Sequence, residues 1–388
     1  MTRCAVLLTA ICLVVGSASA ATFVVTKSTD DPVDGCDADC SLREAVIAAN
    51  LTVEHDTILV PAGTYVLSLV GAGEDAAATG DLDLNEDVTI IGNAAGGTVI
   101  DGNLSDRLVH LNGATVELVD LVLTRGNTIG DFYGAGGILV ESGTITMTRC
   151  VLSDCSCDAH GGGIFSLGTV IVDRSAVIGN TGFQGGGIYH AGADLVLLNS
   201  TVSGNSATAN FSGGVSTDGL ATGATINNST ITGNTGPESD AAVFRCPVHV
   251  ANTIFDGSCV VIAGMGTVLS DGGNLESPAD TCGLDHATDM TGVTAGDLAL
   301  GPLLDNGGLT PTHALDIASV AVNSANNALC PATDQRDWQR VDGSCDIGAF
   351  EVGAVEPALF ADGFESGTTG GWSSTVPQSP LVRATGRI

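Results

Sequence analysis

Residues 161–188, GGGIFSLGTVIVDRSAVIGNTGFQGGGI, contain the pattern that decides the fold of this chain of 388 residues. A Gly-Gly-Ile tripeptide stands at residues 136–138, 162–164 and 186–188, and Gly-Gly-Val follows at residues 213–215. The last residues of these tripeptides are 26, 24 and 27 positions apart. Self-similarity at a period of about 20–50 residues is typical of proteins built from stacked structural repeats.

Two further patterns run in phase with these glycines. A Gly-Asn pair ends a short run of small and β-branched residues at Asn180, Asn205 and Asn234, where the asparagines are expected to bond to one another in a ladder from coil to coil. Upstream of each pair, apolar residues alternate with polar ones, which indicates strands with one buried face. The side chains that we expect to point inward are Val170, Val172, Leu195, Leu197 and Ile226.

The repeats predict an all-β parallel β-helix with three short strands per coil and a period of about 25 residues. Its two ends need caps, because each would otherwise expose a row of unpaired backbone groups. Ser41 and Glu44 form a capping-box motif, so we expect a short amphipathic helix over residues 41–51 at the N-terminal end. The region after residue 264 loses the glycine repeat and is expected to form a disulfide-bearing C-terminal cap.

The first 20 residues have the layout of a secretory signal peptide. Arg3 precedes an apolar run, and small residues end at Ala20. The expected domains are a signal peptide (1–20), an N-terminal cap (21–87), a β-helix (88–263), a C-terminal cap (264–352) and a flexible tail (353–388). No transmembrane segment is expected, and we expect a monomer that is secreted or held at the outer cell surface.

Removal of the signal peptide would leave ten cysteines, an even number that predicts disulfides in an exported chain. Their proximity in the sequence favours three pairs, of which the last is the weakest: Cys36 with Cys40, Cys330 with Cys345, and Cys259 with Cys282. The sequence leaves the partners of four cysteines open: Cys150, Cys155, Cys157 and Cys246.

The charge of the chain restricts its partners. The sequence has 12 Lys and Arg against 44 Asp and Glu, a formal net charge of −32. A chain with so few cations lacks the basic patch with which proteins bind nucleic acid, so no nucleic-acid partner is expected. A glycan or another extracellular surface is the expected partner. Anionic glycans would bind only with Ca²⁺, because the acidic protein repels them.

Four segments resemble a known group of secreted proteins. CSLREAVIAAN (residues 40–50) and its continuation to residue 84 resemble the CSLREA-domain proteins, and residues 301–351 resemble the choice-of-anchor Q module. Asp337 stands where that group usually has glycine, which affects only a local turn. FADGFESGTTGGW (residues 360–372) is similar to tails on secreted proteins of Gram-negative bacteria. The resemblance implies a secreted right-handed β-helix of the pectin-lyase-like shape, and it implies no catalytic residues.

Two groups of side chains are candidates for an exposed ligand face. Arg149, Arg174 and Asn199 recur one coil apart, in a ladder that Asp120 and Asn228 extend. A second group lies in the turn of one coil and consists of Asp154, Asp158 and His160. A solvated turn and a structural ladder are the plainer interpretations of both groups.

Two functions therefore stay open from the sequence. The first is a non-catalytic β-solenoid with a binding, adhesive or structural role outside the cell. The alternative is a carbohydrate-active enzyme, a polysaccharide lyase or glycoside hydrolase, although no catalytic residues are assigned because no paired-carboxylate motif is recognisable. No cofactor is assigned, and acidic clusters at residues 30–39 and 81–87 leave Ca²⁺ open as a ligand.

Overall fold

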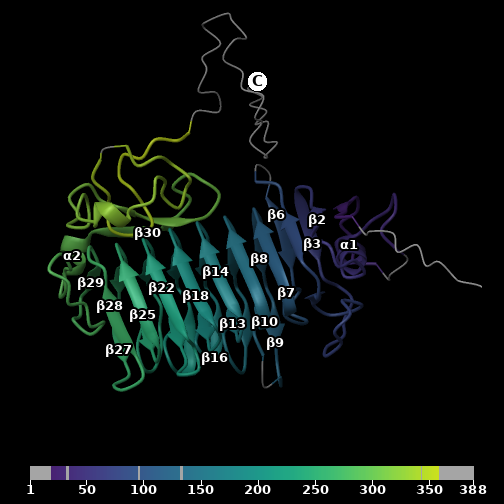
Figure 1. Cartoon of the computed structure of the whole chain (residues 1–388), viewed down its shortest axis with the longest axis horizontal. Coiled ribbons are helices and arrows are strands. Elements are labelled where there is room, and N and C mark those ends of the chain that lie inside the picture. The colour runs from purple at the N-terminus through teal and green to yellow at the C-terminus, as the bar shows by residue number, and fades with distance from the viewer. Residues whose placement is uncertain (1–18, 32–34, 95–96, 132–133, 342, 358–388) are drawn as a thin grey trace, which may run out of the picture.

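The chain folds into a long β-solenoid with a helix at one end and a cap on one flank (Figure 1). The computed structural model describes residues 19–31, 35–94, 97–131, 134–341 and 343–357. Most of the predicted signal peptide and most of the predicted tail lie outside the described residues. Within the described part of the chain, no helix is long and apolar enough to cross a membrane.

Three sheets of parallel strands form the walls of the solenoid, which is right-handed as predicted. Sheet A has 16 strands: β1 (Thr22–Val24), β2 (Asp56–Leu59), β4 (Leu82–Leu84), β5 (Val88–Ile91), β7 (Val109–Val119), β10 (Ile138–Thr148), β13 (Ile164–Ser166), β14 (Thr169–Asp173), β17 (Ile188–His190), β18 (Asp194–Leu198), β21 (Val215–Thr217), β22 (Gly223–Asn227), β24 (Ala242–Phe244), β25 (Pro247–Ala251), β27 (Cys259–Val261) and β28 (Thr267–Ser270).

The other two walls are narrower. Sheet B has nine strands: β3 (Gly63–Val66), β6 (Thr98–Asp101), β8 (Leu121–Thr124), β11 (Val151–Ser153), β15 (Ala176–Ile178), β19 (Thr201–Ser203), β23 (Thr230–Thr232), β26 (Ile254–Asp256) and β29 (Leu275–Ser277). Sheet C has four strands: β9 (Asn127–Thr128), β12 (Ser156–Cys157), β16 (Thr181–Gln184) and β20 (Ser206–Asn210).

Sheet A bends, so a central coil contains four short strands where the sequence predicts three. Strand β10 runs unbroken for 11 residues, yet it pairs with β13 through one half and with β14 through the other. The corner between β13 and β14 falls at Gly168, where an added Cβ would lie 2.6 Å from the Gly143 carbonyl oxygen. Only glycine permits so close a backbone approach, and an alternating pattern does not reveal it.

The core follows the predicted alternation. Val170, Val172, Leu195, Leu197 and Ile226 are all fully buried, and the register places them in rows across adjacent coils. The same parallel register brings equivalent residues of successive coils together, so each repeat buries the apolar face of its neighbour.

The asparagine ladder is confirmed. The Asn205 Oδ1 accepts from the Asn180 backbone N–H at 2.9 Å, and Asn234 Oδ1 accepts from the Asn205 N–H at 2.9 Å. A serine ladder runs beside it, in which Ser175, Ser200 and Ser229 accept from backbone N–H groups one coil away. The two ladders satisfy buried N–H groups at the corners, where no strand partner is available.

The N-terminal end is closed by the predicted helix, α1 (Leu42–Ala49). Its capping box is complete: the Ser41 hydroxyl accepts from the Glu44 N–H at 3.2 Å, and the Glu44 carboxylate accepts from the Ser41 N–H at 2.7 Å. Arg43 is fully buried, pairs with Asp30 at 2.6 Å and donates to three backbone carbonyls of the loop that precedes β4. The helix is therefore fixed to the first coils by both packing and charge.

The C-terminal region is a cap on the flank of the solenoid, above the ends of strands β14, β18 and β22 in Figure 1. The predicted boundary at residue 264 falls inside the last coils, since β28 and β29 still pair with sheets A and B. The regular cap elements begin later, with helix α2 (Ala295–Leu298), the antiparallel strands β30 (Leu300–Leu304) and β31 (Thr312–Leu315), and the 3₁₀ turn η1 (Asn327–Leu329).

The cap lies over the outer face of sheet B and is held there by apolar packing and by hydrogen bonds. Ile254 and Leu275 of the solenoid pack with Leu298 and Ile347 of the cap. Gln335 accepts from the Thr201 hydroxyl at 2.6 Å. The side chains of sheet B that point away from the core would otherwise be exposed to water, and the cap buries them.

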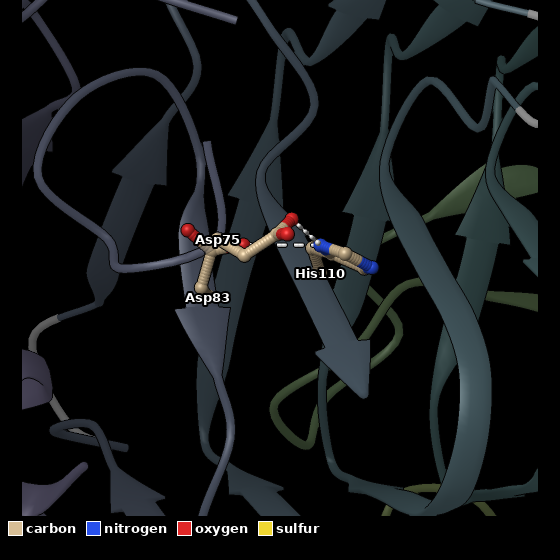
Figure 2. A group of neighbouring side chains, drawn as sticks. All are labelled: Asp75, Asp83 and His110. Atoms are coloured by element: carbon tan, nitrogen blue, oxygen red, sulfur yellow. Dashed lines mark hydrogen bonds and ion pairs between the residues drawn. The ribbon is translucent and has the colours of Figure 1, made fainter. Parts of the chain in front are cut away.

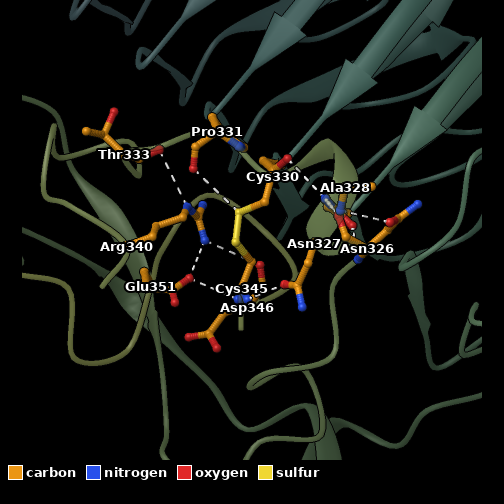
Figure 3. The surroundings of a disulfide bond; sticks show 12 residues. Asn326, Asn327, Ala328, Cys330, Pro331, Thr333, Arg340, Cys345, Asp346 and Glu351 are labelled. Carbon is orange, nitrogen blue, oxygen red and sulfur yellow. Dashed lines mark hydrogen bonds and ion pairs between the residues drawn. A yellow bond between two sulfur atoms is a disulfide. The ribbon is translucent and has the colours of Figure 1, made fainter. Parts of the chain in front are cut away.

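All three predicted disulfides are formed, Cys36–Cys40, Cys259–Cys282 and Cys330–Cys345. Figure 3 shows the last of these beside Arg340, which pairs with Glu351 and so joins the chain on both sides of Cys345. The disulfide therefore belongs to a locally cross-linked part of the cap.

The four cysteines without assigned partners are free and buried. Two of them replace the usual residues of the ladders. Cys155 donates its backbone N–H to Asn180, and Cys150 donates to Ser175. Each takes a corner position one coil before the ladder residue, so these two cysteines have a structural role at a corner rather than in a disulfide.

Candidate functional site

The residues at one corner of each coil form a column that we call the polar ladder. It lies at the corner between sheets A and B, where the chain passes from one wall to the next within one or two residues. Every member has positive φ, between 44° and 58°, which asparagine and aspartate tolerate better than other residues. The members are Asp120, Arg149, Arg174, Asn199, Asn228 and Asn252.

A groove of about 410 Å³ runs between the polar ladder and the C-terminal cap. The solenoid side contributes the ends of β14, β18 and β22 and the ladder residues that follow them. The cap side contributes η1 and the chain after it. The groove is lined by Asp173, Arg174, Leu198, Asn199, Asn227, Asn228, Ala328, Leu329, Cys330, Pro331 and Thr333. We call it the cap groove.

The arginines of the ladder are held by carboxylates. Arg149 pairs with Asp120 at 2.6 Å, and Arg174 pairs with Asp173 at 2.7 Å. Asp337 of the cap reaches both arginines, contacting Arg174 directly and lying 3.7 Å from Arg149. Asp337 has φ of 65°, so the residue that replaces the expected glycine keeps the glycine-like turn and adds a charged contact.

The prediction that the ladder is exposed is therefore wrong for part of it. Asn199 is 5% exposed and Asn228 is fully buried, while Arg149 and Arg174 are half-buried. The physical reason is the cap, which packs on the corner more than a hundred residues later in the sequence. Of the predicted face, Arg174 and Asn199 line the cap groove.

Two ladder amides have an unsatisfied atom. The Oδ1 of Asn199 and the Nδ2 of Asn228 are both buried without a hydrogen-bond partner. Asn228 Oδ1 does accept from the Asn252 Nδ2 at 3.3 Å, so the chain of amide bonds breaks between Asn228 and Asn199. A buried polar atom without a partner costs about 1–3 kcal/mol. The break lies beside the cap groove, because both residues line it.

The second predicted group does not come together as a site. Asp154 is exposed in a left-handed turn, and the Asp158 carboxylate accepts from the Gly130 N–H at 3.0 Å. His160 stacks on Phe165 and Tyr189 with ring centroids 5.0 and 5.1 Å apart. Burial lowers the pKa of His160, so its ring is neutral and serves packing.

His160 belongs to a small apolar cluster on the outside of sheet A that the repeat analysis missed. Phe165 and Tyr189 are in register and face outward beside Phe211. Arg245 covers the Phe211 ring at 3.9 Å, and the Tyr189 hydroxyl donates to Asp218 at 2.9 Å. Its signal in the sequence is the residue that follows each Gly-Gly-Ile, since alternation turns that residue outward.

The acidic residues singled out as candidates for Ca²⁺ take separate partners. Asp30 binds Arg43, Asp31 and Asp39 bind Lys27, and Asp87 accepts from the Thr115 N–H at 2.7 Å. Asp83 instead contacts a histidine. Within the described part of the chain, the two clusters form no cage made of oxygen atoms alone.

Comparisons with known proteins agree with this architecture. A family model described as "Right handed beta helix region" matches residues 86–272. The crystal structure of pectate lyase Pel9A is similar, with a TM-score of 0.51 and 16% sequence identity over 87% of this chain and 97% of that chain. At this identity the likeness concerns the fold alone. None of the curated proteins matches this sequence.

Proposed function

We propose that this chain is a non-catalytic β-solenoid that binds a neutral glycan in the cap groove, outside the cell. The observation that carries the proposal is the broken amide ladder. It leaves a buried acceptor on Asn199 and a buried donor on Asn228 without partners, in two residues that line the groove. A sugar hydroxyl donates and accepts at once, so the proposed ligand would place a hydroxyl at this break once the two amides turn toward it.

The size and lining of the cap groove support a small polar ligand. A volume of about 410 Å³ falls in the range of small-molecule sites, roughly 300–1,000 Å³. Polar groups from Asp173, Asn227 and Thr333 stand beside the aliphatic surfaces of Leu198 and Leu329. A sugar ring has hydroxyls on its edge and C–H groups on its faces, so it matches such a mixed lining.

The charge of the groove supports a neutral ligand over an anionic one. Arg174 is the groove's cation, and it is already paired with Asp173 and contacted by Asp337. The protein as a whole carries a formal charge of −32, which repels polyanions. A uronate would therefore find no free cation among the described residues that line the groove.

The proposed location outside the cell rests on three features. The first 20 residues have the layout of a signal peptide, three disulfides are formed, and the resemblance to CSLREA-domain and choice-of-anchor Q proteins points to export. We propose that the exported chain, residues 21–388, acts as a monomer, which size-exclusion chromatography with light scattering tests.

The deciding experiment is a glycan array with the mature chain, followed by titration calorimetry on the best neutral oligosaccharide. Asn227→Ala and Thr333→Val are expected to weaken binding by up to about tenfold, because each removes a polar group of the groove whose hydrogen bond is worth about 0.5–1.5 kcal/mol. Asn210→Ala, at the exposed end of β20, is the matched control and should bind like the parent chain. Equal affinity of all three variants would place the ligand elsewhere.

The alternative of a carbohydrate-active enzyme is tested on the same material. The proposal expects no reducing ends and no unsaturated products from a panel of neutral and uronate polysaccharides, with and without divalent cations. Turnover that is lost in Asp154→Ala, Asp158→Ala or His160→Ala would replace the binding function by an enzymatic one.

A further inference from the structure

A histidine and two aspartates meet on the outer face of sheet A near the N-terminal end. Asp83 of β4 and His110 of β7 are register partners, so they lie side by side on neighbouring strands. Leu82 and Leu84 on either side of Asp83 are buried in the core, which turns Asp83 outward. Asp75 approaches from the loop that precedes β4 (Figure 2).

The three side chains have the spacing of metal ligands. His110 Nδ1 lies 3.0 Å from Asp83 Oδ1 and 3.9 Å from Asp75 Oδ1. All three ligand atoms lie within 4.8 Å of one another. Two donors bound at about 2.0–2.2 Å to one ion stand roughly 3.0–3.5 Å apart. Only the Asp75 side chain has to move closer, and it is 76% exposed.

The surroundings of the cluster support a ligand as well. The second Asp83 oxygen is held by the Ala77 N–H at 2.7 Å, which directs the first toward His110. His110 is 8% exposed, and its Nε2 is buried without a hydrogen bond, 3.7 Å from the Glu141 carboxylate. Histidines that bind metals through one nitrogen direct the other N–H toward such a carboxylate.

We propose that Asp75, Asp83 and His110 bind a divalent transition-metal ion such as Zn²⁺, with Glu141 as the outer partner of the histidine. An imidazole ligand favours such ions over Ca²⁺ and Mg²⁺, which prefer oxygen donors alone. Three protein ligands leave at least one coordination position to water, which is also the arrangement of catalytic zinc sites. The site is separate from the cap groove and does not depend on its function.

The test is titration calorimetry of the chelator-treated mature chain with Zn²⁺, Mn²⁺ and Ca²⁺ at pH 7.5, with the melting temperature as a second measurement. We expect one Zn²⁺ per chain and an increase in melting temperature. His110→Gln should abolish binding. Asp75→Asn changes an exposed loop residue that the fold does not need, and it should weaken binding at least about tenfold.

His249→Gln is the matched control. His249 forms a similar pair with Asp271 at 3.3 Å, but no third ligand completes a cluster there among the described residues. This variant should bind Zn²⁺ like the parent chain. Equal binding by the parent chain, His110→Gln and Asp75→Asn would overturn the site, as would the absence of Zn²⁺ binding or a preference for Ca²⁺.

Discussion

His190 is a single residue that makes the folded state sensitive to acid. It is fully buried in β17, and neither of its ring nitrogens makes a hydrogen bond. Ser166 and Thr217 are its register partners on the adjacent coils, and both are buried as well. This short polar row lies inside an otherwise apolar wall, where the penalty of burial outweighs the attraction of Asp194 for a charged imidazole.

Stability should therefore fall between pH 6.5 and 4. Burial lowers the pKa of His190 to about 4 in the folded chain, while the unfolded chain keeps the ordinary value near 6.5. Between these values the unfolded chain binds a proton that the folded chain does not, so acid favours unfolding by up to about 3 kcal/mol. Melting curves at pH 7 and pH 4.5 measure the loss.

The effect of His190 is isolated by the variant His190→Leu, whose stability should fall less between pH 7 and pH 4.5 than that of the parent chain. His249→Gln changes an exposed histidine, so its stability should fall as much as that of the parent chain. An unchanged pH dependence in His190→Leu would assign the acid sensitivity to other groups.

The free thiols should be inert in the folded chain. Burial raises the pKa of Cys150 and of Cys155 to about 12, so almost no thiolate exists at pH 8. A disulfide-exchange reagent should label none of the free cysteines in buffer and all of them in guanidinium chloride. Rapid labelling of the native protein would show that these corners open.

At the scale of the secondary-structure elements, the asparagine ladder joins neighbouring coils at a corner. Asn205 Oδ1 accepts from both the backbone and the side chain of Asn180, and its Nδ2 donates to the Val177 carbonyl at 2.9 Å. Removing this side chain leaves several buried groups without partners. Each such group costs about 1–3 kcal/mol.

Asn205→Ala should therefore destabilise the chain by about 3 kcal/mol or more in chemical denaturation. Asn210→Ala removes the same side chain a few residues later, at an exposed position, and should change the free energy of unfolding by less than about 0.5 kcal/mol. Similar effects of the two changes would mean that the ladder does not couple the coils.

The sequence predicts those elements that a short-range pattern specifies. Alternation identifies the inward valines and leucines, the Gly-Asn pairs identify the ladder, and Ser41 with Glu44 identifies the helix. The bend of sheet A at Gly168 escapes prediction, because it depends on a backbone contact with the previous coil. Asp83 and His110 lie 27 residues apart, close to one coil period, so the repeat length could have paired them.

At the scale of the whole molecule, the cap is the feature that local patterns do not reveal. Arg174 and Asn199 are recognisable from their spacing, but their burial depends on residues 328–337, which only the tertiary fold brings near. The groove and the contacts of Asp337 with both arginines are therefore products of long-range packing.

Loss of the Cys330–Cys345 disulfide should loosen the cap while the solenoid stays folded. Changing both cysteines to alanine frees a loop with a sequence separation of 15, worth about 3 kcal/mol in the chain-entropy model. Limited proteolysis with mass spectrometry should then show cleavage after residue 300. The same change at Cys36 and Cys40, with a separation of 4, should cost only about 2 kcal/mol and leave the cap resistant.

The way the cap docks fixes how many coils lie beneath it. The cap forms hydrogen bonds with three successive coils. Gln335 accepts from the Thr201 hydroxyl, and the Ala349 N–H donates to the Thr230 hydroxyl one coil later. The Gly348 N–H donates to the Asn252 carbonyl on the next coil. One additional coil would displace everything beyond it by about 4.8 Å along the axis, too far for these contacts to survive together. Repeat proteins commonly gain and lose units by duplication, but here the cap contacts several successive coils at a fixed spacing. Growth of the stack in evolution is therefore confined to the coils before Arg149, which lie outside these contacts.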